Sequence, residues 1–116
     1  MSGIFNKCLG GNMFNKEFKI LIKEYVNNEY AHNPEDGEKI SEYIKENYKG
    51  DCALILDFKG INSVNTAFIN KIVHGLYEKY SSQTLNNYFD LRNYNALIME
   101  TFIKVIENYK EVKNDM

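Results

Sequence analysis

The feature that most constrains this chain is the short apolar run Ala53–Leu56, which stands between Asp51 and Asp57. A run this short, without polar alternation, is typical of a strand that is buried on both faces of a sheet. Strands of this kind usually alternate with helices, which form the crossover connections between them. The run therefore predicts an α/β domain built around one central strand.

Amphipathic helices are predicted on both sides of this strand. Before it, Asn33 is a typical helix cap, Pro34 suits a first turn, and Gly50 is typical of a helix end. The apolar stripe of this helix consists of Ile40, Tyr43, Ile44 and Tyr48. After the strand, Asn65 or Thr66 can cap a second helix. Its apolar face repeats every three or four residues and consists of Phe68, Ile69, Ile72, Val73, Leu76, Tyr77 and Tyr80.

Further strands and a last helix complete the predicted order β-β-α-β-α-β-α. Residues 18–26 have the apolar pattern of a strand, and Tyr30–His32 is predicted to return beside it as the second strand of a hairpin. Tyr88–Leu91 predicts another strand, and a final amphipathic helix begins after Asn93 or Asn95.

Length and composition describe one soluble domain. The chain has 116 residues, enough for a single core, which we expect over residues 16–116 after a flexible leader at residues 1–15. Two cysteines, Cys8 and Cys52, are too few for a disulfide framework or a zinc knuckle. With a net charge of −2 and scattered lysines, the chain lacks the basic face that nucleic acids or anionic membranes require. It also lacks a signal peptide and an apolar stretch of about 20 residues, so a cytoplasmic location is predicted.

The segment 53–68, ALILDFKGINSVNTAF, resembles the STAS domain (sulphate transporter and anti-sigma factor antagonist). The likeness rests on an apolar strand, an Asp-Phe-x-Gly-Ile turn that starts at Asp57, and a small polar group that opens a helix. The chain is more similar still to the bacterial STAS-like family of unknown function. The motifs matched to that family are Asn65-Thr66-Ala67-Phe68 and Gly75-Leu76-Tyr77. The resemblance extends over roughly residues 18–111.

This resemblance implies a mixed central sheet of about four strands with helices packed on one side, and a protein that is not an enzyme. In anti-sigma factor antagonists, a partner kinase phosphorylates a serine at the start of the helix after the turn. The unphosphorylated form binds that kinase. The corresponding residue here is Thr66, although the acidic residue before the hydroxyl and the glycine after it are both missing. Thr66 therefore has two interpretations, a phosphorylation site and a plain helix cap.

The predicted partner-binding residues follow the central strand. They are Asp57, Asn62, Ser63, Asn65 and Thr66. Asp57 has the position of a receiver-domain phosphoryl acceptor, but the first strand ends in Tyr25-Val26-Asn27 and supplies no acids for Mg²⁺. We expect Asp57 to accept hydrogen bonds from its own turn instead.

Catalytic and metal motifs are not visible in the chain. The histidines, His32 and His74, have no partner at the spacing of metal ligands, and no nucleophile elbow or phosphate-binding loop occurs. The sequence therefore predicts a protein without a catalytic site, cofactor or metal.

Three kinds of function are compatible with the sequence at this point. The first is a regulatory module that binds a protein partner, which by resemblance is a histidine-kinase-like ATPase or a serine kinase. The alternatives are a sensor that binds a small ligand or nucleotide at the carboxyl ends of the strands, and a self-associating subunit of a bacterial defence or mobile-element system.

Overall fold

The computed structural model describes residues 16–115, with side chains from 16 to 110. The leader predicted at residues 1–15 lies outside the described residues. The elements in chain order are β1 (Glu17–Leu21), the 3-10 helix η1 (Ile22–Glu24), β2 (Tyr30–Ala31), α2 (Pro34–Asn47), β3 (Ala53–Asp57), β4 (Ser63–Val64), α3 (Thr66–Lys79), α4 (Ser82–Tyr88), β5 (Phe89–Arg92) and α5 (Ala96–Asp115). No helix within this part of the chain is both long and apolar enough to span a bilayer.

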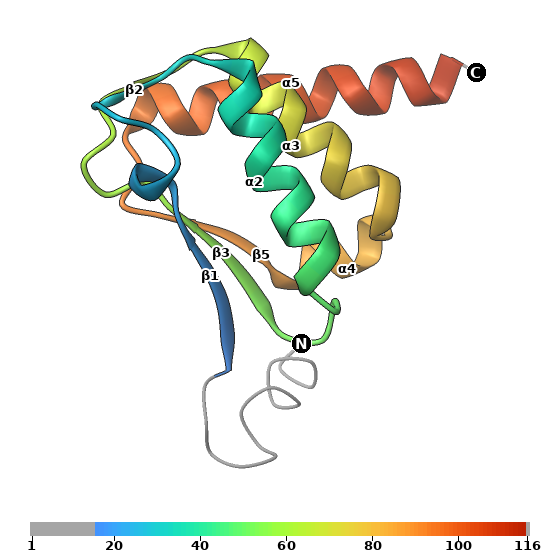
Figure 1. Cartoon of the computed structure of the whole chain (residues 1–116). Coiled ribbons are helices and arrows are strands. Elements are labelled where there is room, and N and C mark those ends of the chain that lie inside the picture. The colour runs from blue at the N-terminus through green and yellow to red at the C-terminus, as the bar shows by residue number, and fades with distance from the viewer. Residues whose placement is uncertain (1–15, 116) are drawn as a thin grey trace.

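The main sheet is parallel and has the strand order β1-β3-β5. The predicted central strand is confirmed, because β3 pairs with β1 on one side and with β5 on the other. The crossovers carry α2 between β1 and β3, and α3 with α4 between β3 and β5. These helices lie on the same face of the sheet (Figure 1). An α/β domain with helices on one side is therefore what the chain forms.

The predicted hairpin between the first two strands is wrong. After β1 the chain turns through η1, where the Tyr25 N–H donates to the carbonyl oxygen of Ile22, and it leaves the sheet. The next strand, β2, then pairs in parallel with β4 rather than with β1. The expected mixed sheet of about four strands is thus a parallel sheet of three strands with a separate parallel ladder of two. Both short strands lead directly into a helix, so the ladder sets α2 and α3 side by side.

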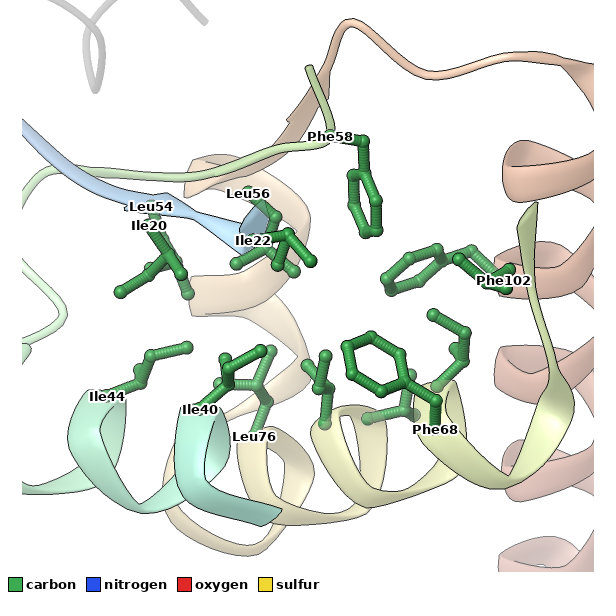
Figure 2. Close-up of a cluster of buried hydrophobic side chains, with 14 of the residues drawn as sticks. Ile20, Ile22, Ile40, Ile44, Leu54, Leu56, Phe58, Phe68, Leu76 and Phe102 are labelled. Atoms are coloured by element: carbon green, nitrogen blue, oxygen red, sulfur yellow. The ribbon is translucent and has the colours of Figure 1, made fainter. Parts of the chain in front are cut away.

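The core lies between the sheet and the helices (Figure 2). Side chains at alternate positions of the strands point toward apolar side chains of α2, α3 and α5, as the helical stripes predicted. Ten of the residues in this cluster are labelled in Figure 2: Ile20, Ile22, Ile40, Ile44, Leu54, Leu56, Phe58, Phe68, Leu76 and Phe102. Each large side chain buried in this way contributes about 1.5–3 kcal/mol to folding.

Two glycines allow α2 and α3 to pack closely. A Cβ added at Gly37 would lie 2.5 Å from the carbonyl oxygen of Phe68, and one added at Gly75 would lie 2.9 Å from the Cβ of Ser41. Real side chains do not approach so closely, so neither position has room for a methyl group. The contact between these two helices therefore depends on glycine at both positions.

The opposite face of the sheet carries charged side chains. The register places Glu17 at one corner of this face and Arg92 at the corner diagonally across from it. Their side chains form an ion pair of 2.8 Å that joins β1 to β5. Ile55, in the middle of the central strand, is only 1% exposed, although it lies outside the main core cluster.

Candidate functional site

The segment from Asp57 to Thr66 joins β3 to α3 and is held firmly in place. Its turn contains Gly60, whose φ of 83° is one that glycine adopts without strain. The Ile61 N–H donates to the carbonyl oxygen of Phe58 at 2.9 Å, and both of these side chains are buried. The residues between these anchors and the helix are consequently presented on a rigid backbone.

Asp57 ends the central strand and is nearly buried, with 4% of its surface exposed. Its Oδ1 accepts hydrogen bonds from the Asn93 side chain at 2.8 Å and from the Lys59 N–H at 3.0 Å. The ammonium of Lys19 lies 3.6 Å from Oδ2. Burial acts to raise the pKa of Asp57, but the two hydrogen bonds and the Lys19 charge together hold the pKa below its ordinary value.

The expected hydrogen bond from the turn to Asp57 is therefore confirmed, and the structure adds a second donor, Asn93. Asn93 has a positive φ of 56°, a conformation that asparagine tolerates better than most residues. The Asp57 carboxylate therefore binds the backbone of the turn at Lys59 and the side chain of Asn93, and so helps to hold the loop in place. A direct contact between Asp57 and a partner stays a prediction.

Asn65 is the cap of α3. Its Oδ1 accepts from the Phe68 N–H at 2.9 Å, while its Nδ2 donates to the carbonyl oxygen of His32 at 3.0 Å. One side chain thus closes the start of α3 and ties it to the residue before the cap of α2. Thr66 is then the first residue of the helix, and its side chain is exposed. The residue that caps α3 is therefore Asn65, and not Thr66.

Asn62 and Ser63 lie against β2 and the start of α5. The Asn62 N–H donates to the carbonyl oxygen of Glu29 at 2.8 Å, and its own carbonyl oxygen accepts from the Asn95 side chain at 2.9 Å. Ser63 is opposite Tyr30 in the ladder, and its Oγ lies 2.8 Å from Nε2 of His32. The structure therefore adds His32 and Asn95 to the residues that the sequence placed here. His32 and Asn95 are far from the loop in the sequence, so no local pattern indicated that they lie beside it.

Three exposed apolar side chains lie in segments that pair or hydrogen-bond with this loop. Tyr30 is 50% exposed, Tyr94 is 45% exposed and Leu97 is 46% exposed. Tyr30 is the ladder partner of Ser63, whereas Tyr94 and Leu97 flank Asn95, which binds Asn62. We name this region the loop surface, and it consists of Tyr30, His32, Asn62, Ser63, Thr66, Tyr94 and Leu97. In Figure 1 it lies near the label of β2 and the beginning of α5, where α5 contacts β4.

Two other kinds of site have little support in the geometry. Within residues 16–115, no group of three or more His, Cys, Asp or Glu side chains is placed to hold a metal ion. The strand order β1-β3-β5 contains no reversal, and ligands of open α/β sheets bind where the order reverses.

Comparison with known proteins identifies the family. No curated protein and no solved structure matches the chain significantly. A family model described as "STAS-like domain of unknown function (DUF4325)" matches residues 36–98, which is more than half of the chain. The match includes most of α2 together with β3, the loop, α3, α4 and β5. The chain therefore belongs to the family of STAS-like domains of unknown function.

Proposed function

We propose that this chain is a non-enzymatic regulatory module of the cytoplasm, which binds a protein partner through the loop surface. The observation that carries the proposal is that three exposed apolar side chains, Tyr30, Tyr94 and Leu97, occur in the two segments that pair or hydrogen-bond with the loop. Exposed aromatic residues are enriched in the centres of protein interfaces. Polar groups between them supply the hydrogen bonds that give such an interface its specificity.

The loop surface is ordered before a partner arrives. Asn65, Asn95 and Asp57 each fix part of its backbone through side-chain hydrogen bonds. Binding therefore costs little conformational entropy, which raises affinity for a given contact area. This arrangement favours recognition of a folded partner.

Thr66 is the residue through which a kinase would regulate binding. The first turn of α3 contains no acidic residue, in contrast to α2, whose first turn contains Glu35 and Asp36. The positive end of the α3 dipole is therefore available to stabilise a phosphate. A phosphate on Thr66 adds up to two negative charges within the loop surface and would oppose the docking of an apolar partner face. By family resemblance, the partner is a histidine-kinase-like ATPase or a serine kinase.

A pair of exposed residues on one helix provides the test. Leu97 belongs to the loop surface, whereas Ile103 lies further along α5 with nearly the same exposure, 46% against 47%. The tagged full-length chain is expressed in its own host, and its partners are captured and identified by mass spectrometry. We expect Leu97→Ser and Thr66→Glu to lose the wild-type partner and Ile103→Ser to retain it.

Either of two results would contradict this proposal. If Leu97→Ser keeps the partner that the wild-type chain captures, the loop surface is not the docking site. If Thr66→Glu keeps that partner and no phosphate is found on Thr66, the switch is absent even where the docking site is correct.

A further inference from the structure

One pair of side chains in the loop surface has the arrangement of a nucleophile and its base. The Oγ of Ser63 and the Nε2 of His32 are 2.8 Å apart, although 31 positions separate the two residues in the chain. The parallel ladder of β2 and β4 brings them together, and the Asn65 side chain holds the His32 backbone in place. The pair thus rests on a fixed framework.

The distance suits transfer of the hydroxyl proton. In the tautomer that carries its proton on Nδ1, His32 accepts the Ser63 hydroxyl hydrogen on Nε2. A serine bonded in this way to a neutral imidazole is activated as a nucleophile. His32 is exposed and Ser63 is half-buried, so a small electrophile can reach the oxygen. We propose that Ser63 is a modification site that takes an acyl group from an activated ester, with His32 as its general base.

The acylation step is as follows. Ser63 Oγ attacks the carbonyl carbon of the ester while its proton passes to His32 Nε2. The bond from that carbon to the leaving oxygen breaks, and the leaving group departs with the electron pair. An ester forms on Ser63, and the imidazolium returns its proton to the leaving group or to water.

The product should accumulate rather than turn over. Among the described residues, the His32 side chain contacts Ser63 and the ring of Tyr30, and no carboxylate orients the imidazole as in a catalytic triad. Activation of water for the second half of the reaction is therefore weak. This inference does not depend on the proposed docking function, and a modified Ser63 would place an apolar group within the loop surface.

The experiment uses the full-length chain and p-nitrophenyl acetate as the probe. We expect release of one equivalent of p-nitrophenolate, followed by little further release, and an acetyl group on the peptide that contains Ser63. Ser63→Ala should abolish this burst. His32→Ala should slow it about 100-fold.

Matched controls separate this chemistry from general surface reactivity. Ser82→Ala removes an exposed hydroxyl outside the loop surface, and His74→Ala removes the other histidine; both should leave the burst unchanged. The variants are compared only where their circular dichroism matches that of the wild-type chain, and His32→Gln provides a second test of the base. Acetyl groups found only on lysines or cysteines would overturn the proposal. An undiminished burst in Ser63→Ala, or a normal rate in both His32 variants, would also overturn it.

Discussion

Replacement of Gly75 by alanine tests how closely the two parallel helices are packed. Gly75 faces Ser41, and a methyl group there would collide with the Ser41 hydroxyl and lie 2.9 Å from its Cβ. A change in the Ser41 rotamer can move the hydroxyl, but it leaves the Cβ in place. The variant must therefore push α2 away from α3 or distort one of the two helices.

Two opposing effects set the magnitude. Alanine favours a helix over glycine by about 1 kcal/mol. An extra methyl group in a tightly packed contact typically costs about 1–3 kcal/mol, and a contact this short belongs at the upper end of that range. We therefore expect Gly75→Ala to lower the free energy of unfolding by about 1–2 kcal/mol. For a domain of this size, each kcal/mol corresponds to about 4 °C in Tm.

Urea unfolding of the full-length chain, followed by circular dichroism, measures this loss. The double variant Ser41→Ala with Gly75→Ala should be less destabilised than the sum of the single variants, because loss of the hydroxyl relieves part of the collision. Gly37→Ala is the comparison. Its added methyl group meets the backbone oxygen of Phe68, which cannot rotate away, so Ser41→Ala should not rescue it.

A stability of Gly75→Ala equal to or above that of the wild-type chain would refute this reasoning. It would mean that the helices separate without loss, and that helix propensity alone decides the effect. If the effects of Ser41→Ala and Gly75→Ala on the free energy of unfolding are additive, the contact between these two residues is not the cause of the destabilisation.

Three further changes test the supports of the fold and the site. Tyr80→Phe removes the hydroxyl that donates to the carbonyl oxygens of Ile44 and Tyr48, and we expect a loss of about 1–3 kcal/mol by urea unfolding, while Tyr43→Phe at an exposed tyrosine changes little. Asp57→Asn should be less stable than the wild-type chain at pH 7. Because the pKa of Asp57 is lower in the folded state, the difference in stability between the two chains should shrink as the pH falls below about 4. A difference that does not change with pH would exclude an electrostatic origin. Asn65→Ala should lower the free energy of unfolding by about 1 kcal/mol because it removes the helix cap, whereas Thr66→Ala should lower it much less. Equal losses in the two variants would show that Asn65 is not the cap.

The helices and the central strand could be predicted because their signals are local. The cap at Asn33, the apolar periodicity after Asn65 and the unbroken run Ala53–Leu56 each describe a surface that one element must bury. All three elements occur where they were expected. The short helix α4 was missed, because its seven residues contain a single buried apolar side chain, Leu85, and show no periodicity.

Strand pairing could not be predicted in the same way. Tyr30–Ala31 reads equally well as a strand that pairs with β1 or with β4, because two residues carry no register of their own. In the structure the chain leaves the sheet through η1, and β2 pairs with β4. The separate ladder and the contact between α2 and α3 therefore support each other, and neither could be found from the two residues of β2.

The loop surface shows the same division. Asn62, Ser63 and Thr66 were named from the sequence because they come from one short segment beside a motif. Tyr30, His32, Tyr94 and Leu97 lie about thirty residues away on either side, and no local pattern links them to that segment. The sequence by itself determined the fold class, the central strand and the family, since these depend on local periodicity and motif spacing. Only the tertiary structure decided which distant side chains share the surface, because parallel pairing of β2 with β4 and the entry of α5 beside the loop bring them together.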